Sequence, residues 1–286
     1  MAAPQENLPD ASAEGEKLKI YFLPNLMTAA NLFCGFLALT KIVEADPDSL
    51  NFDTVIHEAL FLILLACIFD LLDGRVARMG GHESPFGREF DSLADVVSFG
   101  AAPAFLVHRI VLKGVFVGEY QQFGWFIASV YLICGAFRLA RFNCLAAMNS
   151  RSSSKEFLGF PIPAAAGLVA SLTLFLLWLE EKGFNQSKLR YALPVLLVFL
   201  SCMMVSEVKY PSFKSLHFRS RGSFIKVLII ALCVCFFMIL WKKVLPVLAP
   251  VLFTTYLLYG FVRPFISRAL RREIEDEEED DQEQAK

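Results

Sequence analysis

The sequence predicts an all-α protein, a polytopic membrane helix bundle with about eight transmembrane helices. Three observations support this prediction. Of the 286 residues, 56% are hydrophobic and 20% are charged, with a mean hydropathy of +0.51, whereas soluble domains are about half apolar and a quarter charged. The apolar residues are gathered in long stretches, and the basic residues favour one side of them. This composition excludes a disordered protein, a nucleic-acid-binding protein and an ordinary soluble enzyme.

Eight apolar stretches alternate with short polar loops. A helix needs about 20 mostly apolar residues to cross a bilayer, and its backbone satisfies its own hydrogen bonds there, so we expect each stretch to be a helix. The second stretch is short and runs directly into Asp70, and only Lys242 and Lys243 separate the last two, which predicts a tight hairpin. The stretches are residues 22–43, 55–72, 92–112, 123–147, 161–179, 190–206, 225–241 and 244–263.

Lysine and arginine are distributed unequally between the two sides of this bundle. If the N-terminus is cytoplasmic, nineteen of the 27 basic residues lie on the cytoplasmic side. This agrees with the excess of lysine and arginine that the cytoplasmic loops of membrane proteins generally carry. Both termini and the loop after the second helix are therefore expected in the cytoplasm. The last fourteen residues hold nine acids, so the net charge of −2 combines a basic membrane body with an acidic tail, which we expect to be solvated.

Four aspartates occur in two pairs around a glycine-containing turn between the second and third stretches. Asp70 and Asp73 are three residues apart, and Asp91 and Asp95 are four apart, so each pair shares one face of a helix. The turn lets the two faces meet, which brings four carboxylates together near a membrane interface. Ionised groups at that depth are costly and mark a functional site.

Such a cluster of carboxylates requires cations. Oxygen ligands suit hard divalent ions such as Mg²⁺ or Mn²⁺, and two ions held by shared carboxylates can clamp a phosphoryl group and activate a hydroxyl. Gly74 and Ala77 leave room for a ligand, and Arg78 is placed to hold a phosphate. The alternative is a set of helix-end acids paired with neighbouring arginines, which four acids at this spacing fit poorly.

The full pattern, D-x2-D-G-x2-A-R-x8-G-x3-D-x3-D, begins at Asp70 and ends at Asp95. It resembles the signature of the CDP-alcohol phosphatidyltransferase family at every fixed position. The resemblance implies a membrane enzyme with a six-helix core, usually homodimeric, in which an alcohol displaces CMP from a CDP-linked lipid with the help of divalent metal. It implies Asp70, Asp73, Asp91 and Asp95 as metal ligands, Asp95 also as catalytic base, and Gly74, Ala77, Arg78 and Gly87 as contacts of the CDP group.

The start of the first helix and the segment after Asp95 hold further candidates. In the stretch P-N-L-M-T-A-A-N, Thr28 and Asn31 are candidate CDP-binding residues, although a helix cap with polar packing explains them equally well. The small residues that surround Ser98 allow close helix packing, and Ser98 is a candidate for the acceptor site.

The end of the fourth helix carries two arginines and an asparagine. Arg138 and Arg141 lie three residues apart, so they either anchor the helix or bind an anion such as a lipid phosphate or an amino-acid carboxylate. Asn143 follows in the same stretch. These stretches resemble the serine-accepting branch of the family, over roughly residues 20 to 206.

The resemblance implies that L-serine attacks CDP-diacylglycerol to give phosphatidylserine and CMP, with Asp95 as the base and two divalent ions, Mg²⁺ or Mn²⁺, as cofactors. The same chemistry with glycerol 3-phosphate, an inositol phosphate or choline is the alternative, and a cation transporter is a remote one. We expect a homodimer in the bacterial cytoplasmic membrane, surrounded by lipid, with its active site on the cytoplasmic side. The expected parts are a cytoplasmic segment (1–19), the catalytic core (20–206), a cytoplasmic basic loop (207–224), a C-terminal transmembrane pair (225–264) and an acidic disordered tail (265–286).

Overall fold

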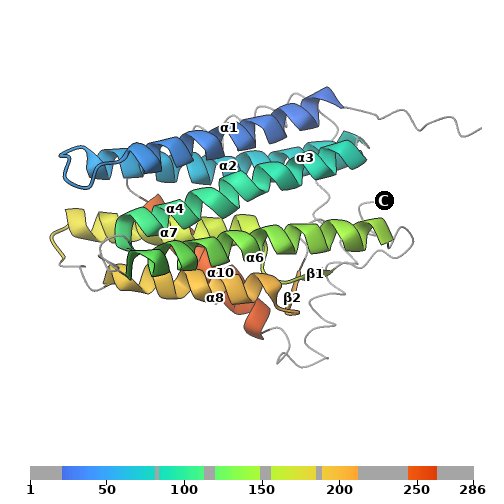
Figure 1. Ribbon diagram of the computed structural model, residues 1–286. Helices are drawn as coiled ribbons and strands as arrows, with labels where there is room; N and C mark the ends of the chain where they lie inside the picture. The colour runs from blue at the N-terminus through green and yellow to red at the C-terminus, as the bar shows by residue number, and fades with distance from the viewer. Residues whose placement is uncertain are drawn as a thin grey trace, which may run out of the picture.

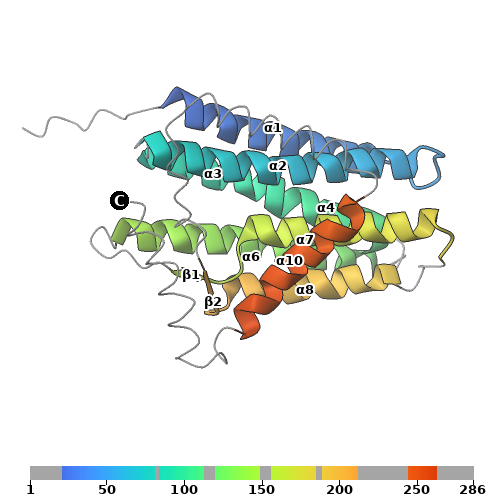
Figure 2. The same ribbon diagram turned by 180° about the vertical axis from the view of Figure 1, so that it is seen from behind.

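The computed structural model describes residues 21–80, 84–112, 120–148, 156–184, 189–211 and 244–262. Within these ranges, long helices lie roughly side by side, and one small sheet lies at one end of them (Figures 1 and 2). The helices are α1 (Phe22–Glu44), α2 (Phe52–Gly80), α3 (Pro85–Asp95), η1 (Val96–Ala101), α4 (Ala102–Val107), η2 (His108–Leu112), α6 (Gln121–Met148), α7 (Ile162–Glu181), η4 (Leu189–Tyr191), α8 (Ala192–Val205) and α10 (Leu245–Val262), and the strands are β1 (Glu156–Leu158) and β2 (Lys209–Pro211).

Helices α1 and α2 form an antiparallel hairpin along one side of the bundle (Figure 1). The carbonyl of Ala45, the residue that caps the C-terminus of α1, accepts hydrogen bonds from the guanidinium of Arg109 in η2. Helix α2 continues past residue 72, where its apolar stretch ends, to Gly80. Asp70 and Asp73 therefore belong to a continuous helix, because charged side chains end the hydropathy signal without breaking backbone hydrogen bonds.

The third predicted helix begins earlier than its apolar stretch. Ser84 caps the N-terminus of α3, where its hydroxyl accepts a hydrogen bond from the Gly87 N–H at 3.0 Å, and Pro85 occupies the first helical position, which needs no N–H donor. From Pro85 the segment runs as one helix to Leu112. Two π-helical stretches, η1 and η2, interrupt its α-helical pattern.

Five helices of the described residues are long and apolar enough to cross a membrane, which identifies the chain as a membrane protein. They are Phe22–Glu44, Phe52–Val76, Pro85–Leu112, Gln122–Ala147 and Ile162–Glu181, and Ala192–Val205 and Leu245–Gly260 are shorter apolar helices. The predicted helix 225–241, and the hairpin that it would form with the last helix, lie outside the described residues. The prediction of a helical membrane bundle is confirmed, while the number of eight spans stays a prediction.

The sheet was not predicted from the sequence. Strands β1 and β2 have three residues each and pair in antiparallel orientation, with Phe157 opposite Tyr210. Gly159 follows β1 with a φ of +78°, and a Cβ there would collide with the backbone of Met204, so this turn requires glycine. The pair ties the segment before α7 to the segment after α8.

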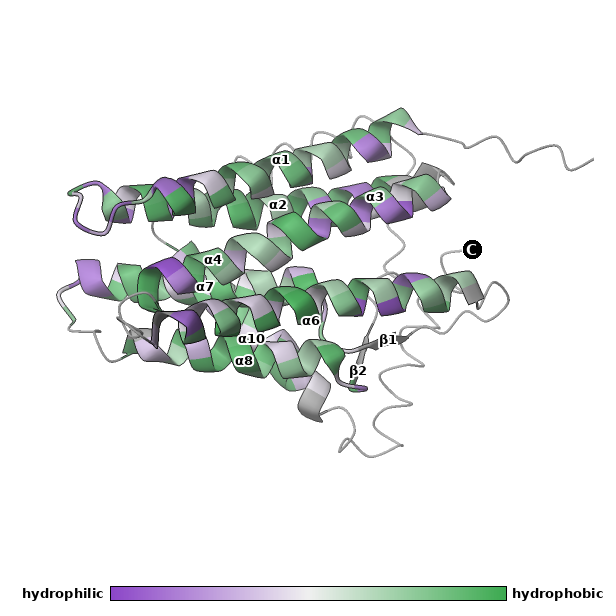
Figure 3. Cartoon of the chain, in the orientation of Figure 1, coloured by the Kyte–Doolittle hydropathy of each residue, from purple (hydrophilic) through white to green (hydrophobic). Residues whose placement is uncertain are grey.

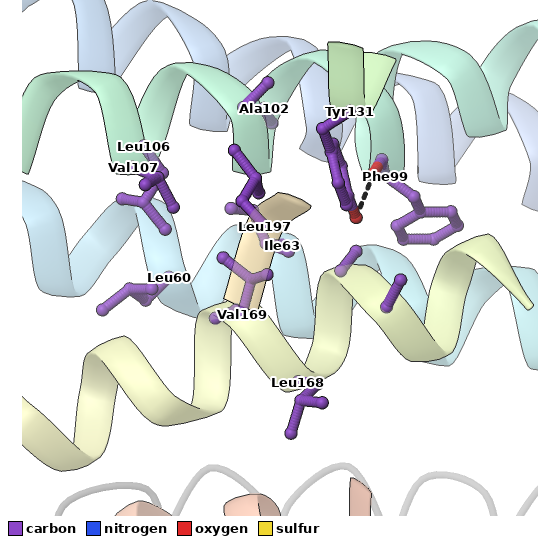
Figure 4. Packing of buried hydrophobic residues seen from close by; sticks show 14 of the residues in the cluster. Leu60, Ile63, Phe99, Ala102, Leu106, Val107, Tyr131, Leu168, Val169 and Leu197 are labelled. Carbon is purple, nitrogen blue, oxygen red and sulfur yellow. Dashed lines mark hydrogen bonds between the residues drawn. The ribbon is translucent and has the colours of Figure 1, made fainter. Parts of the chain in front are cut away.

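Large apolar side chains fill the centre of the bundle and also cover its outside. Leu60, Ile63, Leu106 and Tyr131 are among the fully buried ones (Figure 4), whereas many Phe, Leu and Val residues along the helices are exposed. Hydrophobic residues extend along most of the helix lengths, and hydrophilic ones gather at the ends and on α3 (Figure 3). An apolar lateral surface is what lipid contact requires.

Candidate active site and metal centre

Three carboxylates meet where the last turns of α2 approach α3. Asp70 belongs to α2, and Asp91 and Asp95 belong to α3, and one carboxylate oxygen from each lies within 4.8 Å of the other two. Asp95 is buried and the other two are partly buried. Grouped carboxylates with limited access to water repel one another unless a cation lies between them. The donor set, all oxygen and all anionic, fits a hard divalent ion such as Mg²⁺ or Mn²⁺.

Asp73 is the fourth acid of the predicted cluster, and one of its carboxylate oxygens is bound to α1. It is buried, and its Oδ2 accepts a hydrogen bond from the Thr28 hydroxyl of α1 at 3.0 Å. The group of acids that meets within 4.8 Å does not include it. The structure therefore brings three of the four predicted carboxylates together, and the role of Asp73 as a metal ligand stays a prediction.

Helix α1 supplies the hydrogen-bond donors that reach both acid pairs. The Nδ2 of Asn31, which is fully buried, donates to Oδ1 of Asp95 at 3.2 Å. Thr28 and Asn31 are thus two buried polar side chains of α1 that each donate a hydrogen bond to one of the acids. Such neighbours orient carboxylates. Direct contact of Thr28 and Asn31 with a CDP group stays a prediction.

The remaining signature residues lie on α2 and α3. Gly74 follows Asp73 on α2 and is partly buried. Gly87 lies in the first turn of α3, where an added Cβ would come within 3.2 Å of the Ser84 hydroxyl and 3.4 Å of Oδ1 of Asn25. The side chain of Asn25 on α1 thus reaches the start of α3 at Gly87. Ala77 and Arg78 belong to α2, and their side chains lie outside the described part.

The structure separates the two arginines that the sequence analysis grouped. Arg138 is 8% exposed, and its charge interacts with those of Asp95 and Asp70, but it forms no ion pair with a carboxylate of the described residues. Arg141 instead contacts the end of α8, where it donates to the Val205 carbonyl at 3.4 Å and lies 3.7 Å from Glu207. Arg138 is therefore buried within electrostatic range of the acids, whereas Arg141 contacts residues at the end of α8.

Asn143 and Ser98, the other candidates for the acceptor site, have partners on different elements. Asn143 Nδ2 donates to the hydroxyl of Ser92 at 2.9 Å and to Glu89 at 3.2 Å, both on α3. The hydroxyl of Ser98 donates to the Asn31 carbonyl at 3.0 Å. Each residue joins two helices, and neither shares a hydrogen bond with Arg138 among the described residues.

One residue near the site escaped the sequence analysis. Tyr131 of α6 is fully buried, and its hydroxyl donates to the Phe99 carbonyl in η1 at 3.1 Å (Figure 4). A tyrosine within an apolar helix carries no signal that distinguishes it from other core residues. Only the placement of α6 against η1 reveals the bond.

The similarity of this chain to known proteins covers the helices from α1 to α8. The family model described as CDP-alcohol phosphatidyltransferase matches residues 21–205. The CDP-diacylglycerol–serine O-phosphatidyltransferase of Helicobacter pylori is 35% identical over 246 residues, which is 85% of this chain and 91% of the relative. The enzyme of that name from Methanocaldococcus jannaschii is 31% identical over 86% of this chain and 95% of the relative. The archaetidylserine synthase of Methanothermobacter thermautotrophicus is 34% identical over 66% of this chain and 69% of its own.

Proposed function

Because the chain belongs to the CDP-alcohol phosphatidyltransferase family, we propose that it transfers the phosphatidyl group of CDP-diacylglycerol to the hydroxyl of L-serine, giving phosphatidylserine and CMP. The observation that carries the proposal is the meeting of Asp70, Asp91 and Asp95 within 4.8 Å, close to the buried charge of Arg138. The relatives whose names include serine support the choice of acceptor.

In the proposed reaction Asp95 is the base. It accepts the proton of the serine hydroxyl while that oxygen forms a bond to the β-phosphorus, which carries the diacylglycerol. The bond from this phosphorus to the oxygen that bridges the two phosphates breaks, and CMP leaves with that oxygen and its electron pair. The hydrogen bond from Asn31 to Oδ1 of Asp95 fixes the orientation of the carboxylate, and positioning of the two substrates supplies much of the acceleration.

The aspartates would hold two divalent ions, Mg²⁺ or Mn²⁺. When bound, these ions neutralise negative charge on the pyrophosphate and on the departing CMP. Asp70 and Asp91 would act as ligands from α2 and α3, Asp95 would be a ligand as well as the base, and Asp73 would be the fourth ligand. The residues proposed to contact the CDP group are Thr28, Asn31, Gly74, Ala77, Arg78 and Gly87.

Arg138 favours an amino-acid acceptor over a phosphorylated one. A buried guanidinium is unfavourable without an anionic partner, and the described residues provide none within ion-pair distance. The serine carboxylate carries one negative charge and can take two parallel hydrogen bonds from a guanidinium. A phosphate-bearing acceptor would call for a larger basic pocket, whereas Arg141 already contacts Val205 and Glu207. Asn143 and Ser98 would shape this acceptor site from α6 and η1.

The lipid substrate and product place the reaction at a membrane surface. We propose a homodimer in the bacterial cytoplasmic membrane, with the catalytic core (20–206) facing the cytoplasm at the end where the aspartates lie. The acyl chains of CDP-diacylglycerol remain in the bilayer while its pyrophosphate reaches the acids. The excess of basic residues predicted for this side supports the orientation.

An acceptor screen tests the proposed function. The purified protein is supplied with CDP-diacylglycerol and with L-serine, glycerol 3-phosphate, inositol phosphate or choline in turn, and CMP release is measured with Mg²⁺, with Mn²⁺ and with EDTA. We expect metal-dependent release of CMP with L-serine and with none of the other three acceptors. Release with glycerol 3-phosphate but not with serine would overturn the acceptor, and ion flux in proteoliposomes without CMP release would indicate a transporter.

A further inference from the structure

The helix that carries Asp91 and Asp95 changes its hydrogen-bond pattern immediately after Asp95. Residues Val96–Ala101 form the π-helix η1, in which each turn holds an extra residue, so the helix on one side of it is rotated relative to the other. Segments of this kind are rare and occur often at functional sites. The direction in which Asp95 points therefore depends on how η1 is held in place.

Helix α1 holds η1 from one side. The hydroxyl of Ser98 donates to the Asn31 carbonyl at 3.0 Å, and the Asn31 side chain donates to Asp95 at 3.2 Å. The close approach is possible because Gly35 has no side chain: an added Cβ would lie 2.5 Å from the Cα of Ser98. One residue of α1 thus bonds both to the π-helix and to the carboxylate that precedes it.

Helix α6 holds η1 from the other side. The hydroxyl of the fully buried Tyr131 donates to the Phe99 carbonyl at 3.1 Å (Figure 4). Gly100 lies against the same helix, since an added Cβ would meet Leu132 at 2.8 Å. A buried carbonyl that loses its donor is unfavourable, so this bond favours the π-helical geometry over other packings of the segment.

We propose that Tyr131 is a positioning residue for the carboxylate site. Its hydroxyl, acting with the contact between Gly35 and Ser98, keeps η1 in the geometry that directs Asp95 toward Asp70 and Asp91. Tyr131 touches neither the acids nor a substrate in this assignment, and it acts through the backbone of Phe99. The inference takes the divalent-metal site from the proposed function, but it does not depend on which alcohol is the acceptor.

The test removes the hydroxyl and measures metal binding directly. Tyr131→Phe retains the ring and loses the bond to Phe99. We expect the Kd for Mn²⁺, measured by electron paramagnetic resonance, to rise on the order of tenfold, as for other residues that orient metal ligands. The kcat for CMP release should fall by a similar factor, while the KM for CDP-diacylglycerol stays within about twofold because the lipid contacts are unchanged.

Thr173→Val is the matched control, because it also removes a buried hydroxyl that donates to a backbone carbonyl. The hydroxyl of Thr173 donates to the Val169 carbonyl at 2.8 Å, and both residues belong to α7. This variant should lower the melting temperature to a similar extent without changing the Kd for Mn²⁺. Gly35→Ala should reproduce the effect of Tyr131→Phe from the opposite side, and it serves if Tyr131→Phe does not fold. Unchanged Mn²⁺ affinity in folded Tyr131→Phe would overturn the proposal, whereas a wild-type protein that binds Mn²⁺ without releasing CMP would overturn only the proposed function.

Discussion

Asp95 is the residue that we propose both as a metal ligand and as the catalytic base. It is buried, it shares the carboxylate group with Asp70 and Asp91, and its Oδ1 accepts a hydrogen bond from Asn31. An asparagine at this position retains an oxygen that can accept that bond but cannot take up a proton. The residue can therefore be changed with little disturbance of its packing.

We expect Asp95→Asn to lower the kcat for CMP release by about a thousandfold or more, since general-base catalysis contributes roughly 10²–10⁴ and the change also weakens the metal site. Binding of CDP-diacylglycerol, measured by titration, should remain within a few-fold. Asp48→Asn is the control and should retain full activity, because Asp48 is an exposed acid in the turn between α1 and α2, at the opposite end of these helices. Full activity in Asp95→Asn would exclude this residue as the base.

Arg138 and Arg141 provide a second comparison within one helix. Arg138→Gln should raise the KM for L-serine by about tenfold or more, because a hydrogen bond to a charged group is worth about 1.5–3 kcal/mol. Arg141→Gln removes an exposed contact with Glu207 and should change that KM by less than about twofold. Steady-state kinetics with serine as the varied substrate distinguish the two variants. Equal effects would contradict the assignment of Arg138 to the acceptor.

The acids could be predicted from sequence because helix periodicity alone brings each pair to one face. The direction of Asp73 toward Thr28 could not, because it depends on where α1 lies against α2. The difference between Arg138 and Arg141 was hidden for the same reason: both arginines share one spacing pattern, and only the packing of α6 in the bundle leaves Arg138 buried and Arg141 in contact with Val205 and Glu207. Tyr131 was missed because its partner is a backbone carbonyl 32 residues away.

At the scale of the elements, seven of the eight apolar stretches correspond to helices of the described residues, but the bounds of these helices could not be predicted. The stretch 55–72 corresponds to α2, which extends from Phe52 to Gly80, and the stretch 92–112 corresponds to a segment that begins at Pro85. The missing turns are polar because they carry the site. The capping signal of Ser84 and Pro85 lies in the sequence and could have located the start of α3, whereas no residue pattern marks the π-helices.

Helix α10 packs closely against α7 at Gly167. A Cβ on Gly167 would lie 2.5 Å from the Cε1 of Phe253 on α10, so the ring occupies the space that a side chain would need. Gly167→Ala should lower the free energy of unfolding by about 1–3 kcal/mol, as overpacking of a core does. Thermal denaturation in detergent measures this change.

The double variant Gly167→Ala/Phe253→Leu isolates this contact. The smaller leucine leaves room for the added methyl group, so the double variant should be more stable than the sum of the two single changes predicts. Mn²⁺ affinity should stay unchanged throughout, since neither residue touches the carboxylates. Additive effects of the two changes would show that α10 does not pack on α7 in the membrane protein.

At the scale of the whole molecule, the polar chemistry lies at one end of an apolar bundle. The end of α2, the start of α3 and the end of α6 lie together with the small sheet (Figure 1), and the carboxylates lie near them. The opposite end carries the turn between α1 and α2 and the end of α7. A substrate with acyl chains can approach such a site from the lipid, while a water-soluble acceptor approaches from the polar end.

The distribution of basic residues predicts that the site end faces the cytoplasm, and labelling can test this prediction. Cys144 is exposed near the end of α6 that lies on the site side, and Asp48 is exposed in the turn between α1 and α2 on the other side. Two variants carry a single cysteine each. In the first, every native cysteine except Cys144 is replaced by alanine. In the second, all native cysteines are replaced by alanine and Asp48→Cys is added.

In intact spheroplasts, a membrane-impermeant maleimide should label the Asp48→Cys variant and leave Cys144 unlabelled until the membrane is opened. The reason is that the predicted topology assigns nineteen of the 27 basic residues to the side of Cys144, and the positive-inside bias predicts that this side faces the cytoplasm. Retained CMP release in both variants controls for folding. The reverse labelling pattern would place the aspartates outside, where CDP-lipid and serine would have to be supplied from the other face of the membrane.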